Sequence, residues 1–408
     1  MIVSKILYKE ELRIFQYNKR NVFFLEKQNG NLWTRLDTIT LQPVWTKDLT
    51  GLNLNESDFY DEYILDGKGL LFDLKTNEVF LLSNQIPHFR WIASPRHEYG
   101  VFSTLEDNIL KSGVYSLQNK TILWINELVI NGLGFGVHDK SNISFLLVSK
   151  DIKGNNKSII ALHFLTGETL WQRSFKELEI NNLDKFIGDI NNILICACGK
   201  TILGLDKNTG EELWRVNHHS ELANAVLNQE SGCVYLFYGW SGSENNFSEN
   251  DNIIFLEIEA LTGKVLYDDS IFKHPNYIEL NGLRHYEGTG DYPRFYNALQ
   301  WKHKIYFLIN SWHSSMVKIM EFDTVNKRIS YLTEQSYEAN ANSNWFIAEG
   351  KLFIQSRISQ QIESEENPDP SYWSKIHRKS QFDGEQMHYQ YFAISKESYL
   401  TIFDLEEN

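Results

Sequence analysis

The chain alternates short apolar runs with turn-forming residues. Runs rich in β-branched, aliphatic or aromatic residues recur along its length, as at Thr201–Leu205, Ser158–Leu162 and Asn252–Leu256. After each of these three runs, polar residues and then a glycine predict a tight hairpin. A Trp or Tyr begins the segment after each hairpin. The pattern predicts an all-β protein of short antiparallel strands.

This hairpin motif repeats. The three clear copies are Phe164–Trp171, Leu205–Trp214 and Ala260–Tyr267, and the four weaker copies are Leu36–Trp45, Leu74–Phe80, Leu117–Trp124 and Phe322–Tyr331. The aromatic residues that end successive copies are separated by 35, 44, 47, 43, 53 and 64 residues. A variable period of about 40–50 residues is typical of a β-propeller blade, and longer spacings indicate loop insertions.

We therefore predict a single all-β domain over residues 1–408, an eight-bladed β-propeller of four-stranded antiparallel blades. The seven motifs supply seven of the blades. Strands for the eighth blade are expected at 345–348, 351–355, 389–394 and 399–403.

Two features of the ring closure remain open at this stage. The spacing of 35 residues before Phe80 is short for four strands, so seven blades with an irregular first unit is the alternative. At the termini, Met1–Tyr8 can add a strand beside Ser398–Leu405. Such a clasp would join the two ends of the chain.

The Asp-x-x-Thr-Gly-x-x-x-Trp pattern, complete at Asp206–Trp214, resembles the repeat of the quinoprotein-type (PQQ-like) β-propeller superfamily. The resemblance implies that the Gly and Trp are structural. Members of that superfamily range from quinone-dependent dehydrogenases to non-enzymatic scaffolds and ligand binders. A dehydrogenase of this kind usually holds its cofactor over adjacent cysteines, with a Ca²⁺ nearby. Because this chain has no adjacent cysteines, we expect no catalytic residues and no cofactor.

Charge and cysteine content narrow the choice of function. The chain has 39 basic and 53 acidic residues, a net charge of −14, which argues against binding to nucleic acid or to an anionic membrane surface. Met1–Glu11 does not resemble a secretory signal, so a cytoplasmic protein is expected. Cys196, Cys198 and Cys233 are predicted to be small buried thiols, the first two facing the same side of one strand. No His lies at ligand spacing near them, so no metal site is expected.

Three long insertions, 239–252, 268–294 and 357–388, are predicted to lie on one face of the propeller. They contain 3, 5 and 6 acidic residues against 0, 3 and 4 basic ones, a net charge of −7. Long loops on a rigid scaffold often bind partners. The residues predicted to bind a partner are Trp240, Glu244, Glu249, Asp251, Tyr286, Asp291, Tyr292, Trp312, His313, Glu363, Glu365, Glu366, Asp369, Tyr372 and Trp373.

These observations predict a non-enzymatic protein, monomeric when free, that binds a basic partner protein through an acidic and aromatic loop face. One concrete version is an inhibitor or immunity protein that masks a basic toxin or nuclease domain. The alternative is an enzyme or small-molecule binder with a site at the axial mouth of the propeller. The axial candidates are His285, Asp291, His313 and Asp369.

Overall fold

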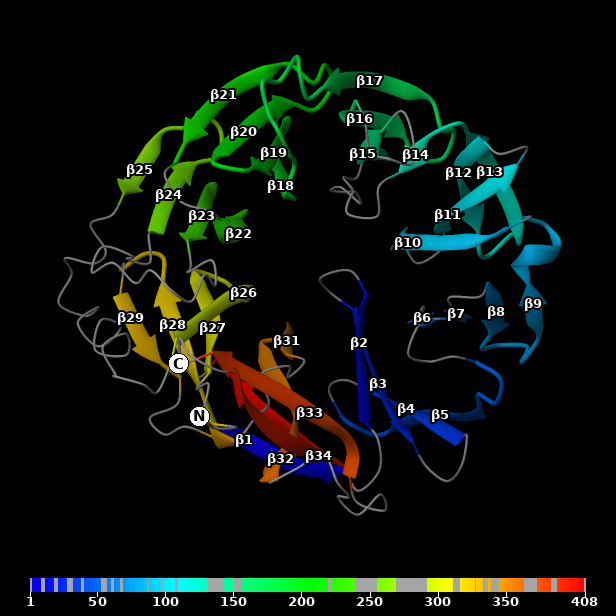
Figure 1. Ribbon diagram of the computed structural model, residues 1–408, viewed down its shortest axis with the longest axis vertical. Helices are drawn as coiled ribbons and strands as arrows, with labels where there is room; N and C mark the ends of the chain where they lie inside the picture. The colour runs from blue at the N-terminus through cyan, green and yellow to red at the C-terminus, as the bar shows by residue number, and fades with distance from the viewer. Residues whose placement is uncertain are drawn as a thin grey trace. The chain divides into compact units, whose positions relative to one another are not determined.

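The structure is a computed structural model. It describes residues 2–8, 12–17, 21–27, 32–37, 40–52, 57–59, 62–66, 69–86, 88–96, 99–106, 109–130, 142–149, 156–218, 222–238, 255–268, 292–310, 316–326, 328–332, 337–338, 345–362, 373–382 and 387–406. The chain divides into two compact units, one of Met1–Gly51 with His274–Asn408 and one of Leu52–Lys273. Within the described residues, the strands form eight antiparallel sheets (Figure 1).

The unit of residues 52–273 contains five four-stranded sheets, and in each the strands pair in the order of the sequence. They are β6 (Ser57–Phe59), β7 (Tyr63–Asp66), β8 (Leu70–Asp73) and β9 (Val79–Leu81); β10 (Arg90–Arg96), β11 (Tyr99–Glu106), β12 (Ile109–Ser116) and β13 (Thr121–Asn126); β14 (Val129–Ile130), β15 (Ile143–Ser149), β16 (Ser158–His163) and β17 (Thr169–Ser174); β18 (Lys185–Ile190), β19 (Ile193–Cys198), β20 (Thr201–Asp206) and β21 (Glu212–Asn217); and β22 (Leu222–Asn228), β23 (Cys233–Tyr238), β24 (Phe255–Glu259) and β25 (Val265–Asp268). A short 3-10 turn, Leu82–Asn84, follows β9.

The other unit contains three sheets. They are β2 (Leu12–Tyr17), β3 (Asn21–Lys27), β4 (Leu32–Leu36) and β5 (Pro43–Asp48); β26 (Tyr292–Trp301), β27 (Lys304–Asn310), β28 (Met316–Asp323) and β29 (Arg328–Tyr331), with β30 (Tyr337–Glu338) beside β28; and β31 (Trp345–Ala348), β32 (Lys351–Ile362), β34 (Met387–Asp404) and β1 (Ile2–Tyr8), with β33 (Trp373–Phe382) also beside β34.

Each of the seven predicted motifs forms the hairpin between the third and fourth strands of a sheet. The spacing of 35 residues before Phe80 accommodates four strands because β6 to β9 are only three or four residues long. The chain is therefore an all-β protein built of four-stranded antiparallel blades of the propeller type. That eight blades close one ring within a single domain stays a prediction.

The tryptophan of the motif joins neighbouring sheets, which agrees with the structural role that the resemblance implies for it. In the unit of residues 52–273, Trp124 Nε1 donates a hydrogen bond to the carbonyl of Phe164 in the next hairpin at 2.7 Å. Trp171 and Trp214 repeat this contact with the carbonyls of Lys207 and Ala260, at 2.7 and 3.1 Å. All three indoles are less than a tenth exposed. Each one combines apolar burial with a satisfied N–H group.

The apolar cores lie between successive sheets. One core combines Ile195 and Ile202 of the β18–β21 sheet with Val234 and Ile258 of the β22–β25 sheet. Other cores join the β10–β13 sheet to the β14–β17 sheet, and that sheet to the β18–β21 sheet. In the unit that holds both termini, the last sheet shares cores with the β26–β29 sheet and with the β2–β5 sheet.

The predicted clasp of the termini is confirmed. Strand β1 pairs antiparallel with β34, from Ile2 opposite Phe403 to Tyr8 opposite Ser398. The N-terminal strand thus supplies the outer strand of the sheet that the C-terminus completes.

One expectation about the last sheet is wrong. The predicted strands at 389–394 and 399–403 are parts of one 18-residue strand, β34. This continuous strand is possible because its partner β32 extends to Ile362 and pairs with β34 over both parts, with a register shift between Arg357 and Ser359. A second correction follows from the first, because much of the predicted loop insertion 357–388 consists of strands.

Candidate functional site

Most of the predicted partner-binding residues lie outside the described residues. This is so for Trp240, Glu244, Glu249, Asp251, Tyr286, Asp291, Trp312, His313, Glu363, Glu365, Glu366, Asp369 and Tyr372. The same holds for the axial candidate His285. Tyr292 and Trp373 begin strands β26 and β33. A single face formed by the three insertions therefore stays a prediction.

The three insertions fall at two kinds of connection between strands. Residues 239–252 belong to the connection between β23 and β24, the second and third strands of their sheet. Residues 268–294 belong to the connection between the outer strand β25 and the next strand, β26. Residues 357–388 fall between β32 and β34, again a second and a third strand, and this insertion carries β33.

In the last insertion, the basic residues lie on strands and the acidic residues belong to the connections between them. Its four basic residues, Arg357, Lys375, Arg378 and Lys379, all lie on β32 or β33. Its six acidic residues are Glu363, Glu365, Glu366, Asp369, Asp383 and Glu385, all in the connections 363–372 and 383–386 outside the described residues. The insertion predicted as part of an acidic face therefore also contains a basic strand.

A local sequence signal could have located β33. The dipeptide Asp383-Gly384 follows the strand directly, and Asp-Gly between two β-rich runs is a strong predictor of a hairpin. Strand β33 pairs with β34 from Trp373 opposite Ser395 to Phe382 opposite Met387, so these two strands do form a hairpin. Strand β33 was not predicted, because the acidic composition of the insertion is typical of a loop.

Where the hairpin motif begins with an aspartate, as at Asp206 and Asp323, that side chain organises the turn. Asp206 Oδ1 accepts the backbone N–H groups of Asn208 and Thr209 at 2.8 and 2.9 Å. Asp323 Oδ1 accepts those of Val325 and Asn326 at 2.8 and 2.9 Å. This is the local side-chain bond that favours Asp in turns. These carboxylates are therefore engaged in holding the hairpins.

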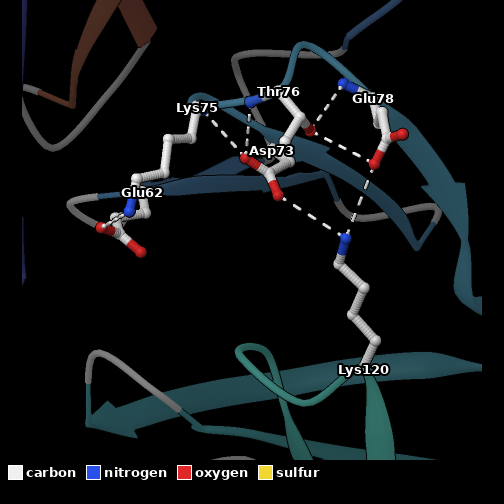
Figure 2. Close-up of polar contacts among 6 residues, drawn as sticks. All are labelled: Glu62, Asp73, Lys75, Thr76, Glu78 and Lys120. Carbon is white, nitrogen blue, oxygen red and sulfur yellow. Dashed lines mark hydrogen bonds and ion pairs between the residues drawn. The ribbon is translucent and has the colours of Figure 1, made fainter.

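In the β6–β9 sheet, the same kind of turn is part of a larger polar cluster (Figure 2). Asp73 Oδ1 accepts the N–H groups of Lys75 and Thr76 at 2.8 and 3.0 Å. Lys120, from the hairpin of the next sheet, places its Nζ 3.6 Å from Asp73 Oδ2 and 3.8 Å from Glu78 Oε2. Burial disfavours the charge of Asp73, but these N–H groups and the Lys120 ammonium outweigh it and lower the pKa of the carboxyl.

Lys120 also lies over the ring of Phe80, with 3.6 Å between Nζ and the ring centroid. It occupies the turn position that is glycine in the clear motifs, and its φ of 55° is close to the 69° of Gly210. Between the later sheets, an indole packs against the turn glycine of the next hairpin. Between the β6–β9 and β10–β13 sheets, the Lys120 cation over the Phe80 ring takes the place of that contact. The cluster is thus best explained as a contact between two sheets.

The three cysteines are buried, as predicted, and form no disulfide. Cys196 and Cys198 belong to the same apolar core, which confirms that they face one side of β19. Burial raises the pKa of Cys198 to about 12, with a further contribution from Asp184, and it also raises the pKa of Cys196. Because the thiolate is the reactive and metal-binding form, these thiols are poor nucleophiles and poor ligands.

Two buried tyrosines face glutamates across neighbouring strands. Tyr235 donates to Glu257 Oε1 at 3.3 Å, and Tyr306 pairs with Glu321 in the corresponding strands of another sheet. Burial first, and then the Glu321 charge, raises the pKa of Tyr306. Lys304 Nζ lies 2.9 Å from Glu321 Oε1. Tyr235 and Glu257 are thus bonded to each other, and Glu321 is paired with Lys304. The buried Tyr306 hydroxyl has no hydrogen-bond partner among the described residues.

Metal sites and membrane-spanning helices are the last two features of the described residues. Among them, no group of three or more His, Cys, Asp or Glu side chains is placed to hold a metal ion. In that same part of the chain, no helix has the length and apolar character needed to cross a membrane.

No family model matches the chain, and no curated protein matches it. Among solved structures, a eukaryotic initiation factor is similar over 85% of this chain and 82% of that chain, with 13% identity and a TM-score of 0.50. BamB from Moraxella catarrhalis is similar over 67% of this chain and 66% of that chain, just under two thirds of BamB, with 16% identity and a TM-score of 0.36. Quinohemoprotein alcohol dehydrogenase from Comamonas testosteroni is similar over 98% and 76%, with 9% identity and a TM-score of 0.47. At these identities the likeness concerns the fold alone.

Proposed function

We propose that this protein is a non-enzymatic binding protein that holds a partner protein through its long insertions. The observation that supports this most directly is the strand structure of the last insertion. Strands β32, β33 and β34 extend the final sheet as a hydrogen-bonded platform. Residues carried on a regular scaffold bind with a smaller loss of conformational freedom than residues on a mobile loop.

The charge of the insertions suggests the partner. Their net charge of −7 is half of the net charge of the protein, in 73 of its 408 residues. An acidic rim that surrounds aromatic residues favours fast and selective association with a basic protein surface. The narrower version is an inhibitor or immunity protein that covers the basic active surface of a toxin or nuclease. We place the protein in the cytoplasm and expect it to be monomeric when free.

The chemistry of the described residues is consistent with a non-enzymatic role. The buried thiols have pKa values raised far above neutral pH. The turn carboxylates of Asp73 and Asp206 accept backbone hydrogen bonds. These reactive groups contribute to the stability of the blades.

The test is affinity purification of the tagged protein from its own host, with two charge-reversal variants. One variant combines Glu363→Lys, Glu365→Lys and Glu366→Lys. The control combines Glu168→Lys, Glu211→Lys and Glu230→Lys, which makes the same charge change at exposed turn residues.

We expect the unmodified protein and the control to retain one stoichiometric, basic protein. The insertion variant should lose roughly tenfold in affinity, which is about 1.4 kcal/mol, with a weaker dependence on salt. Failure to retain any protein, or equal losses in both variants, would contradict the proposal. Turnover that is lost on substituting His285 or Asp291 would instead favour an enzyme.

A further inference from the structure

The outer edge of the last sheet is formed by two strands in succession. Strands β1 and β33 both pair with β34 on the side opposite β32, β1 along residues 398–403 and β33 along residues 387–395. Figure 1 shows β33 beside β34 in the last sheet. Strand β33 therefore continues the outer edge beyond the four-stranded part of the sheet.

Strand β33 has the features of an open edge. Within the described residues its pairing is with β34 alone. Its ten residues make it longer than the outer strands of the other sheets, β5, β9, β13, β17, β21, β25 and β29. From Lys375 to Phe382 its register with β34 has no break, and it contains no proline. About half of the N–H and C=O groups of such a strand point away from its partner and are available for another strand.

The charge on β33 restricts which strand could be added. It carries Lys375, Arg378 and Lys379 and no acidic residue. If a second copy of β33 paired with this edge, two strands that each carry three basic residues and no acidic residue would lie side by side, which is unfavourable. A strand with Asp or Glu at the opposing positions gains favourable cross-strand pairs. The edge is therefore selective for an acidic extended segment.

The chain's own acidic segment is poorly suited to this place. Residues 363–372 contain Glu363, Glu365, Glu366 and Asp369, but also Pro368 and Pro370. Proline has no N–H group to give to a sheet, so two prolines so close together interrupt any ladder. An acidic segment of a partner protein that contains no proline does not have this restriction.

We propose that the outer edge of β33 binds an extended, acidic segment of the partner protein, which adds to the sheet as a further strand. This rests on the proposed function, because it specifies how the partner is held. Main-chain hydrogen bonds supply affinity in such strand addition, and the opposing side chains supply selectivity. A partner with a basic surface and an acidic extended segment would engage both the acidic connections and β33.

The test uses the full-length protein and a fluorescent peptide of the same length as β33, in which Glu alternates with Thr and Val. A matched peptide carries Lys in place of Glu. A third peptide keeps the Glu residues but is N-methylated at consecutive central residues, so that it cannot donate ladder hydrogen bonds. Fluorescence anisotropy measures binding, and amide hydrogen exchange locates it.

We expect the Glu peptide to bind at least roughly tenfold more tightly than either of the other peptides. Its binding should slow hydrogen exchange in β33. The variant Lys375→Glu, Arg378→Glu and Lys379→Glu should reverse the preference between the Glu and Lys peptides. The control variant changes three exposed lysines elsewhere, Lys176→Glu, Lys200→Glu and Lys264→Glu. It should leave the preference for the Glu peptide over the Lys peptide unchanged.

Several results would overturn the inference. One is that the N-methylated peptide binds as tightly as the Glu peptide. Another is that the Glu peptide slows hydrogen exchange outside β33 and not within it. A third is that the protein sediments as a dimer and that the β33 variant sediments as a monomer. Displacement of the Glu peptide by a single-stranded oligonucleotide would indicate a nucleic-acid site instead. If the host partner is captured but is held equally well by the β33 variant, this inference fails while the proposed function stands. If no partner is captured, the proposed function itself fails.

Discussion

The contact between an indole and the next glycine can be tested by adding one methyl group. Gly210 has a φ of 69°, in the left-handed region, and a Cβ there would lie 2.5 Å from Cε3 of Trp171 and 2.7 Å from its Cδ2. An L-residue at this φ costs about 1–2 kcal/mol. Moving the ring to relieve the clash costs about 1–3 kcal/mol for overpacking. The indole bond to the Lys207 carbonyl contributes about 1 kcal/mol more.

Gly210→Ala should therefore lower the free energy of unfolding by about 3–6 kcal/mol. Gly232→Ala is the matched control, because Gly232 has a φ of 67° and the nearest atom to its Cβ would be 4.0 Å away. It should cost only about 1–2 kcal/mol. The difference between the two variants isolates the docking of the indole.

Urea denaturation followed by tryptophan fluorescence and circular dichroism measures both values. Hydrogen exchange should show the loss in the sheets that contain Trp171 and Gly210. Adding Trp171→Leu to Gly210→Ala should cost less than the sum of the two single changes, because both act on one contact. Equal losses for Gly210→Ala and Gly232→Ala would refute the reasoning, since the backbone term would then be the whole effect.

Four further predictions concern other parts of the molecule. Lys120→Met should cost about 1–2 kcal/mol by removing the contact with Phe80 and the ion pairs, whereas Lys302→Met, 52% exposed and 3.7 Å from Glu406, should cost less than about 0.5 kcal/mol. The pKa of the Asp73 carboxyl in the folded protein lies below its ordinary value of 3.8. Its contribution to stability is therefore present above that ordinary value and is lost as the pH falls through the folded-state pKa. The Lys120→Met variant should accordingly lose less stability than the unmodified protein in unfolding titrations from pH 7 to 2. Since all three cysteines are buried, a thiol reagent at pH 8 should label none of them until denaturant is added, and prompt labelling would contradict the buried assignment. Deleting residues 1–8 should lower the melting temperature by roughly 5 °C or more, because β34 loses the outer partner of residues 398–403, and an unchanged value would show that the clasp adds no stability.

The sequence alone determined much of this fold, because the relevant physics is local. Asp206, Gly210 and Trp214 lie within one hairpin, and each acts through the turn or through the strand that follows it. The motif therefore located the third and fourth strands of seven sheets, even where the copy was weak. The strand at Met1–Tyr8 was also predictable, since a sheet that lacks an outer strand needs one to cover β34.

What only the tertiary structure decided concerns pairings between residues that are distant in sequence or unusual for the motif. The role of Lys120 could not be inferred, because its turn looked like a degraded motif until Phe80 and Asp73 of another sheet were placed around it. The strand character of 373–382 depends on β34, a separate segment, being long enough to pair with it. The composition of residues 357–388 is acidic on average, so the sequence indicates one acidic insertion. The strand pairing shows that its basic residues lie on strands, apart from the acidic connections. Turn chemistry is encoded in a few adjacent residues, but strand edges exist only after distant strands have paired.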